Sequence, residues 1–238
     1  MINGASQYLT QNPVLTLFLI CHVLSDYQLQ SQRMADQKEA DLAYFGDHII
    51  GVSIPLICLT LIIPQVWLMS LLVMTSHALI DWLKPKVASY LNWKREWIFL
   101  LDQCLHIGIS LFAGLRLAGV TLPSWLPAPL LLTVLFILLI TKPTNIIFKL
   151  FFGKYQPDQG EKMDTIMGAG ATIGNLERIV IGICMIMGQF ASIGLVFTAK
   201  SIARYNKISE NPAFAEYYLI GSLFSILSVF VAAWLCFF

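Results

Sequence analysis

The chain is poor in charged residues. Asp, Glu, Lys and Arg make up only 12% of its 238 residues, and 57% are hydrophobic, whereas soluble domains carry about 25% charged residues. This shortage excludes an ordinary soluble domain and predicts an integral membrane protein. The net charge is +1, and no basic stretch is interleaved with aromatics, so we expect no nucleic-acid partner.

Paired cysteines and a cleavable signal are also missing. None of the five cysteines forms a CxxC pair and all lie in apolar stretches, so we expect reduced, buried side chains rather than disulfides or a zinc knuckle. The N-terminal stretch MINGASQYLTQNP has no Lys or Arg, which predicts that the first apolar segment is retained. The cysteines are Cys21, Cys58, Cys104, Cys184 and Cys236.

Long apolar runs, in contrast, are abundant. A membrane helix needs roughly 20 mainly apolar residues, and the runs predict an all-α, polytopic helix bundle with about seven spans. We expect Pro143 to kink or end the fifth span and the polar stretch 153–170 to be a cytoplasmic linker. The predicted spans cover about 11–30, 46–63, 66–84, 97–118, 128–141, 175–199 and 214–237.

The distribution of Lys and Arg predicts the orientation. Most of them follow the first, third and fifth spans, which places those loops in the cytoplasm and the N-terminus outside a bacterial inner membrane. Lys200, Arg204 and Lys207 disagree, because the same count places them outside. Either they snorkel, or the number of crossings between about 128 and 205 differs by one from our count.

A His-x-x-x-Asp motif occurs twice, as CHVLSD at 21–26 and SHALID at 76–81. Residues four apart share a helix face, so each span presents an Asp near its cytoplasmic end and a His one turn deeper. Asp102 and His106 give the reverse order in the fourth span, and His48 begins the second. All four histidines of the chain are therefore expected at one depth.

The spacing of the histidines predicts an internal repeat. His48 follows His22 by 26 residues, and His106 follows His77 by 29. Two hairpins in the same direction, related by an axis along the membrane normal, would form a four-helix core with the polar stripes at its centre. The predicted boundaries are about 11–63 and 66–118 for the repeats, 1–120 for the core and 121–238 for the C-terminal membrane helices.

Ionisable groups inside a membrane cost several kcal/mol unless satisfied, and they usually mark function. A single His–Asp pair is more often a structural hydrogen bond, but three pairs and a fourth His at one depth favour a metal site. Imidazole and carboxylate are typical ligands of Zn, Mn and Fe, among which the sequence does not choose. The predicted metal ligands are His22, Asp26, His48, His77, Asp81, Asp102 and His106.

Five further polar residues are weaker candidates. Asp47 and Glu177 are candidate catalytic groups, and Arg178, Gln28 and Gln103 are candidate substrate contacts. Four of them have a structural alternative: an interfacial ion pair or a helix-start carboxylate for Glu177 and Arg178, and hydrogen bonds to polar neighbours for the glutamines.

The stretches CHVLSDYQLQ, SHALIDWLK and FLLDQCLH, and further along IGNLERIVI, GQFASIGLVFTAKSIARY and EYYLIGSLFS, carry a resemblance to a known family. The chain resembles a bacterial integral-membrane family that is catalogued as a domain of unknown function. The resemblance covers nearly the whole chain but implies no activity.

The residues favour a metal-dependent hydrolase of a lipid or lipid-linked ester or phosphoester. A transporter of a metal ion or a proton-coupled solute is the main alternative. The outer halves of the first four spans carry almost no ionisable group, whereas a transport site is expected near the midplane with polar residues toward both faces. A bis-His haem bundle and a structural subunit with a polar core stay open, as does the oligomeric state.

Overall fold

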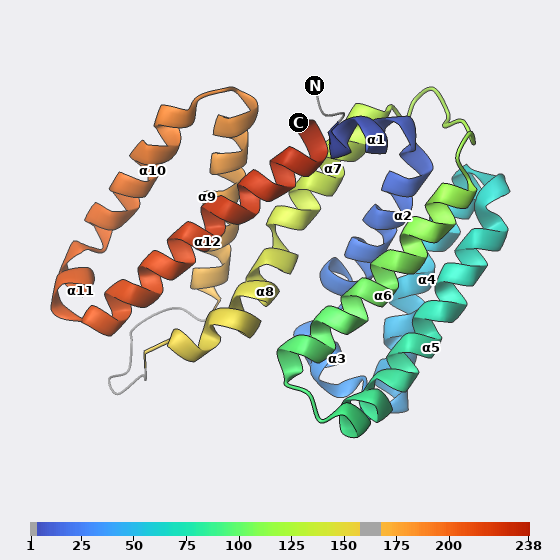
Figure 1. Ribbon diagram of the computed structural model, residues 1–238, viewed down its shortest axis with the longest axis horizontal. Coiled ribbons are helices and arrows are strands. Elements are labelled where there is room, and N and C mark those ends of the chain that lie inside the picture. The colour runs from blue at the N-terminus through green and yellow to red at the C-terminus, as the bar shows by residue number, and fades with distance from the viewer. Residues whose placement is uncertain (1–3, 158–167) are drawn as a thin grey trace. The chain divides into compact units, whose positions relative to one another are not determined.

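The computed structural model describes residues 4–157 and 168–238, and every element in these ranges is a helix. The prediction of an all-α protein is therefore confirmed. The chain forms two compact units, Met1–Leu138 and Leu139–Phe238, which are drawn together in Figure 1 and described separately below. The predicted linker 153–170 lies mostly outside the described residues.

The first unit begins with helices that are short or bent and continues with long ones. Its elements are α1 Ala5–Gln11, α2 Pro13–Val23, a π-helical turn Leu24–Gln28, α3 Gln32–Gln37, α4 Leu42–Ile62, a 3-10 turn Pro64–Val66, α5 Trp67–Leu91, α6 Arg95–Arg116 and most of α7 Ala128–Ile140. The second unit holds α8 Lys142–Phe152, a 3-10 turn Gly153–Tyr155, α9 Ala169–Ile186, α10 Phe190–Ala203, α11 Tyr205–Glu210 and α12 Pro212–Phe237.

Six helices among the described residues are long and apolar enough to cross a membrane. A bent pair, α1 with α2 and its π-helical turn, gives a seventh if it counts as one span, and the bend between its members is 103°. These helices show a multi-pass membrane protein with about the predicted number of spans. The third span is longer than predicted, because α5 runs through Pro85 and ends at Leu91. The next residue, Asn92, takes the left-handed conformation (φ 47°) common at helix ends.

Four helices of unit 1 form a closed ring in which α2 packs against α4 and α6, and α5 packs against the same two helices. Gly114 allows α6 to approach α2 closely, since a Cβ there would lie 2.5 Å from the Leu15 Cα. An apolar core that includes Phe18, Leu56 and Val66 fills the half of the bundle that contains the α4–α5 turn. Polar residues occupy the other half.

The predicted repeat is not confirmed by this arrangement. The helices α2 and α5 carry the same motif and share the neighbours α4 and α6, as the repeat requires. However, α2 changes into a π-helical turn over Leu24–Gln28, whereas α5 stays α-helical through the corresponding stretch. The two hairpins therefore differ locally where their aspartates lie, and the repeat remains a prediction.

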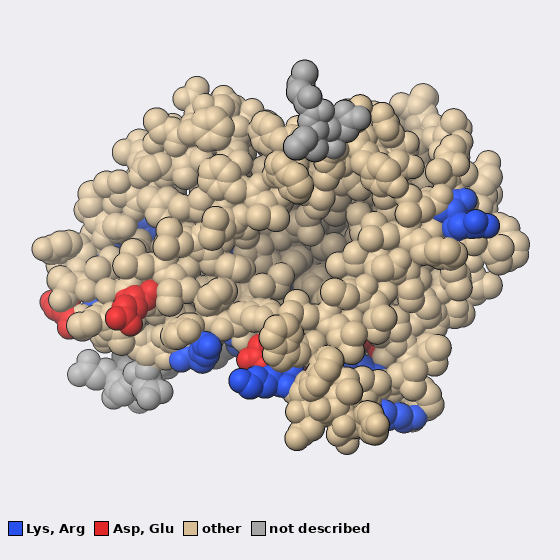
Figure 2. Space-filling model, viewed as in Figure 1, with Lys and Arg blue, Asp and Glu red and all other residues tan. Residues whose placement is uncertain are grey.

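The outer surface of unit 1 is mostly apolar, with most of its charge at one end. Exposed side chains such as Ile57, Leu61 and Leu68 cover the helices. Figure 2 shows blue and red atoms along the lower edge, where α3 and the α5–α6 turn lie in Figure 1, and a further blue group at the right, away from that edge. Cys58 and Cys104 are also exposed on this surface, so the expectation that all cysteines are buried was wrong for these two.

The predicted sixth span, 175–199, is in fact two helices. The helix α9 ends at Ile186, and Gly188 (φ +68°) donates its N–H to Met185 while Gln189 donates to Cys184. This pair of bonds is the Schellman motif, in which a left-handed glycine ends a helix. The helix α10 then packs back against α9. Hydropathy continues through the turn, which is why we predicted one span.

Candidate metal centre

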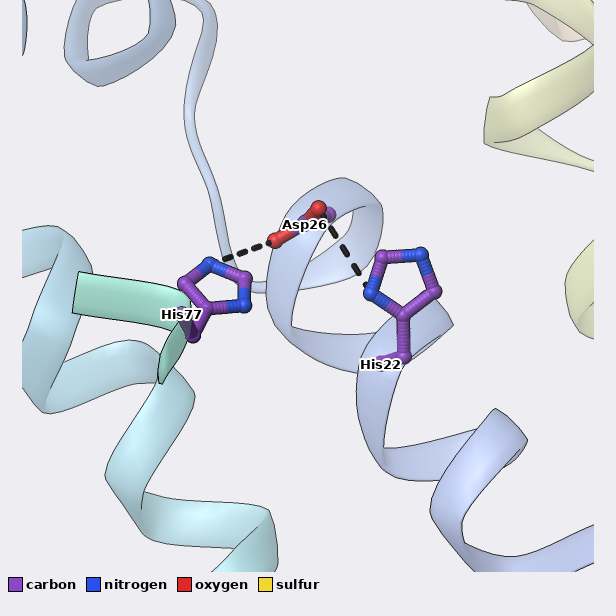
Figure 3. A group of neighbouring side chains, drawn as sticks. All are labelled: His22, Asp26 and His77. Atoms are coloured by element: carbon purple, nitrogen blue, oxygen red, sulfur yellow. Dashed lines mark ion pairs between the residues drawn. The ribbon is translucent and has the colours of Figure 1, made fainter. Parts of the chain in front are cut away.

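The seven predicted metal ligands meet at the polar half of the ring in unit 1. They come from all four helices, and each side chain is at most 8% exposed. Figure 3 shows His22 and His77 facing Asp26 from two sides. The set is His22 on α2, Asp26 in the π-helical turn, His48 on α4, His77 and Asp81 on α5, and Asp102 and His106 on α6.

Local geometry explains why each His–Asp pair faces inward. Three pairs are four residues apart and therefore lie on one helix face. At Asp26 the backbone widens, because Leu29 donates its N–H to Leu24, five residues back. Such π-helical turns are rare and often occur at functional sites. The turn keeps the Asp26 carboxylate 3.6 Å from His22 Nδ1.

Asp26 is the carboxylate of the first of three overlapping groups. In each group the ligand atoms lie within 4.8 Å of one another, and the groups are His22–Asp26–His77, His48–His77–Asp81 and Asp81–Asp102–His106. In the first, His77 Nε2 lies 3.2 Å from Asp26 Oδ1. Residues from α2, from the π-helical turn that continues it and from α5 thus offer both nitrogen and oxygen donors to one point.

Asp81 joins the other two groups through its two oxygens. Its Oδ2 lies 2.9 Å from His48 Nε2, and its Oδ1 lies 3.6 Å from His106 Nε2. The rings of His77 and His106 stack with their centroids 4.0 Å apart. All four imidazoles are therefore within reach of the same small set of carboxylate oxygens.

Several of these buried atoms have no hydrogen bond of favourable geometry among the described residues, although some of them, such as Asp26 Oδ1, lie close to an imidazole nitrogen. Leaving a polar atom buried and unpaired costs about 1–3 kcal/mol. A divalent cation accepts lone pairs from carboxylate oxygens and imidazole nitrogens, so the donor set fits a metal ion. The atoms are His22 Nε2, Asp26 Oδ1, His48 Nδ1, Asp81 Oδ1, Asp102 Oδ1 and His106 Nε2.

Two lysines at the site were not predicted as site residues. Lys38 Nζ lies 2.8 Å from Asp81 Oδ2, and Lys84 Nζ lies 3.4 Å from Asp102 Oδ2. Their ammonium groups face the cluster from the charged end of the bundle. The sequence gives a signal for Lys84, which follows Asp81 by three residues on the same helix face. Lys38 lies outside the spans, and no motif points to it.

Comparison with known proteins identifies this part of the chain. Residues 14–128 match the model of a family described as "Protein of unknown function (DUF3307)". This segment is a DUF3307 domain. The predicted resemblance to a domain of unknown function is confirmed here, and all seven candidate ligands lie inside the match. The stretches of the resemblance beyond residue 128 lie outside it. No curated protein and no solved structure matches the chain.

Gln103 connects two carboxylates of the DUF3307 domain. Its amide donates to Asp26 Oδ2 and to Asp102 Oδ2, each at 3.2 Å, and its oxygen accepts from the Tyr27 hydroxyl at 2.6 Å. It therefore orients the carboxylates. Gln28, the other glutamine candidate, closes the π-helical turn.

The predicted catalytic and anion-binding candidates lie elsewhere. Asp47 precedes His48 but its side chain is exposed, outside the three groups of the DUF3307 domain. Glu177 and Arg178 belong to unit 2, where Glu177 pairs with Lys200 at 2.6 Å. Arg178 donates to the backbone oxygen of Ile140, at the break between α7 and α8, and to the Asn145 side chain.

A cavity of about 10 Å³ lies beside the histidines, lined by His22, His77, His106 and apolar neighbours such as Val73. This is about the volume that one water molecule needs. Beyond it the apolar core of the DUF3307 domain closes the bundle. The interior thus has room for a water or an ion, and a larger molecule would have to approach from the charged end.

Proposed function

We propose that the DUF3307 domain is a membrane-embedded, divalent-metal-dependent hydrolase of a lipid or a lipid-linked ester or phosphoester. The observation that carries this proposal is the meeting of four imidazoles and three carboxylates from four helices, with every one of these side chains at most 8% exposed. A bundle stabilised only by hydrogen bonds has no need to collect all of its histidines around three carboxylates.

The ion would be held by Asp81 together with histidines from α4, α5 and α6. When bound, it would act as a Lewis acid and lower the pKa of a bound water toward neutrality. Asp81 is the central ligand of this proposal, because two of the three groups share it. The His22–Asp26–His77 group offers the same types of ligand atom and could hold a second ion.

The protein's own residues would orient the carboxylates, accept a proton and bind the substrate. Gln103 keeps the carboxylates of Asp26 and Asp102 oriented, and a carboxylate oxygen not bound to the ion would accept a proton from water. Lys38 and Lys84, which contact Asp81 and Asp102, would hold a negatively charged head group. They take the role that the sequence suggested for Arg178.

An amphiphilic substrate is supported by the position of the site in the bundle. Trp82 follows Asp81 directly, Trp93 lies in the α5–α6 turn and Trp97 in the first turn of α6; all three are more than half exposed. Exposed tryptophans are typical of the membrane–water interface. The cluster would thus lie at the level of lipid head groups, and the Lys/Arg bias assigns that interface to the cytoplasmic side of a bacterial inner membrane.

A structural polar core is the second candidate, and the lysines favour it. Asp26, Asp81 and Asp102 carry three negative charges when ionised, and Lys38 and Lys84 supply two positive charges without any ion. Such compensation can satisfy buried carboxylates on its own. Transport is less favoured, because the apolar core occupies the half of the bundle beyond the histidines.

Metal content and hydrolysis, measured on the same protein, test the proposal. The full chain is purified in detergent, supplied with zinc, manganese or iron, desalted and analysed for metal and for hydrolysis of chromogenic lipid esters and phosphoesters. Asp81→Asn keeps the shape but removes a ligand charge, so metal and activity should both fall. Glu216→Gln, an exposed carboxylate of unit 2, is the control and should change neither.

Each outcome separates the candidates. Wild-type protein that stays folded and metal-free with all three ions would leave the polar-core alternative. Protein that binds a metal but hydrolyses none of the substrates would overturn the hydrolase and keep the metal centre.

A further inference from the structure

Unit 2 contains a cavity of about 1000 Å³ that the proposed function does not use. It lies among α8, α9, α10, α11 and α12, and all of its lining residues belong to this unit. A cavity of this volume accommodates a ligand of drug size or larger. Its lining combines charged, aromatic and aliphatic side chains.

The charge of the lining is strongly positive. Arg178, Lys200, Arg204 and Lys207 line the cavity, and Glu177 is the one carboxylate among its described lining residues, which leaves an excess of three positive charges. Glu177 forms an ion pair with Lys200. The other three cations have no carboxylate within ion-pair distance among the described residues. Such a group of cations favours an anionic ligand.

Glu177 indicates, independently of the positive charges, a second property of the ligand. The residue is 8% exposed, and its Oε2 accepts from Lys200 Nζ at 2.6 Å. Its Oε1 is buried and has no hydrogen-bond partner among the described residues. A carboxylate oxygen only accepts hydrogen bonds, so the ligand that satisfies it must bring a donor as well as its negative charge.

The remaining lining is apolar enough for a hydrocarbon chain. Phe148, Phe214 and Tyr217 contribute aromatic rings, and Ile173 and Ile202 contribute aliphatic surface. Lys200 lies 5.0 Å from the ring centre of Tyr218, which places a cation beside aromatic surface. A small hydrophilic anion would leave this apolar part uncovered.

We propose that this cavity binds the head group of an anionic lipid that carries a hydroxyl next to its phosphate. The phosphate lies against Arg204 and Lys207, the head-group hydroxyl donates to Glu177 Oε1, and the first part of the acyl chains covers the aromatic side chains. The site is separate from the His/Asp cluster and does not depend on its metal.

Native mass spectrometry of the full chain in detergent can measure this binding. The probes are phosphatidylglycerol, phosphatidylmethanol, phosphatidylcholine and glycerol 3-phosphate. Phosphatidylmethanol has the charge of phosphatidylglycerol but no hydroxyl, so losing one hydrogen bond should weaken its binding about fivefold. Phosphatidylcholine, which is zwitterionic, should bind more weakly still. Glycerol 3-phosphate distinguishes a soluble phosphate ester from a lipid, and it should bind far more weakly than the lipid.

Variants that each remove one positive charge localise the site. Lys207→Gln and Arg204→Gln should each weaken phosphatidylglycerol binding roughly tenfold, because each removes a charge-assisted hydrogen bond to phosphate. Lys149→Gln removes the same charge from an exposed position of α8 outside the lining and should leave binding unchanged. Metal content should be the same in all three variants, so this test and that of the hydrolase can fail separately.

Three results would overturn the assignment. Equal binding of phosphatidylcholine and phosphatidylglycerol would remove the anionic requirement. Equal weakening by Lys149→Gln and Lys207→Gln would show only a general charge effect. If glycerol 3-phosphate binds as tightly as phosphatidylglycerol, the ligand of the cavity is a soluble phosphate ester and not a lipid.

Discussion

Lys38 and His48 contact the same oxygen of Asp81. Lys38 Nζ lies 2.8 Å from Oδ2, and His48 Nε2 lies 2.9 Å from it. A divalent ion bound at this oxygen would experience the full repulsion of the ammonium group. Lys38 is therefore a built-in competitor of a metal ion at the His48–His77–Asp81 group.

The variant Lys38→Gln separates the two candidate functions. If the site binds metal, removing the competing charge should raise metal affinity at least about tenfold. Without metal the variant should lose about 3 kcal/mol of stability, because a buried carboxylate loses its cation. Metal titration followed by thermal unfolding in detergent measures both effects.

Lys86→Gln is the matched control for that experiment. Lys86 lies on the same helix as Asp81, is exposed, and places its Nζ over the ring of Trp82. It should change neither metal affinity nor metal-free stability by a comparable amount. Destabilisation of Lys38→Gln that no metal ion restores would support the polar core instead.

Gln103→Leu tests whether activity requires the hydrogen bonds by which Gln103 orients the carboxylates of Asp26 and Asp102. The substitution keeps most of the volume but removes the donors to Asp26 and Asp102 and the acceptor for Tyr27. Since the Gln103 amide is already engaged by Asp26, Asp102 and Tyr27, metal content should stay near that of the wild type while kcat of the proposed hydrolysis falls roughly tenfold. Cys104→Ala, at the exposed neighbouring position, is the control. Loss of metal together with activity would show that the amide is needed to form the site itself.

The His/Asp cluster could be predicted from the sequence because two simple rules determine it. A spacing of four fixes the helix face, and hydropathy fixes the depth, so His22, His77 and their aspartates could be placed without coordinates. Lys38 could not, since its position depends on how α3 folds back beneath the bundle. The end of α9 was not predicted for another reason. Gly188 is a local signal for the end of a helix, but the sequence on both sides of it is apolar, so hydropathy predicted one continuous span.

Three Gly→Ala substitutions should have three different effects on thermal stability. Gly188→Ala should cost about 1 kcal/mol, since alanine disfavours the left-handed conformation at φ +68°. Gly46→Ala, inside α4 with no atom within 4 Å of the added Cβ, should stabilise by about 0.5–1 kcal/mol. Gly114→Ala should be the most harmful, because its Cβ would collide with the backbone of Leu15. Thermal unfolding of the three variants in one detergent gives the order, and a stabilising Gly188→Ala would contradict the Schellman ending of α9.

The α9–α10 hairpin also predicts the side of the membrane on which Lys207 lies. Glu177 and Lys200 form an ion pair across the hairpin, eleven residues before and twelve after Gly188. If both helices cross, the chain after α10 returns to the side from which α9 started. The excess positive charge at Lys200, Arg204 and Lys207 then agrees with the positive-inside rule, whereas a single span over 175–199 violates it.

Labelling of single cysteines in intact cells tests this topology. In a background without the five native cysteines, cysteine at Lys86, Lys154 or Lys207 should resist an impermeant thiol reagent until the cells are opened. Cysteine at Ser124 or Met187, in the turns after α6 and α9, should react in intact cells. Reaction of the Lys207 position together with Met187 would mean that α10, with 14 residues, does not cross. Reaction of the Lys86 position from outside would instead reverse the orientation of unit 1 and place the His/Asp cluster at the outer face.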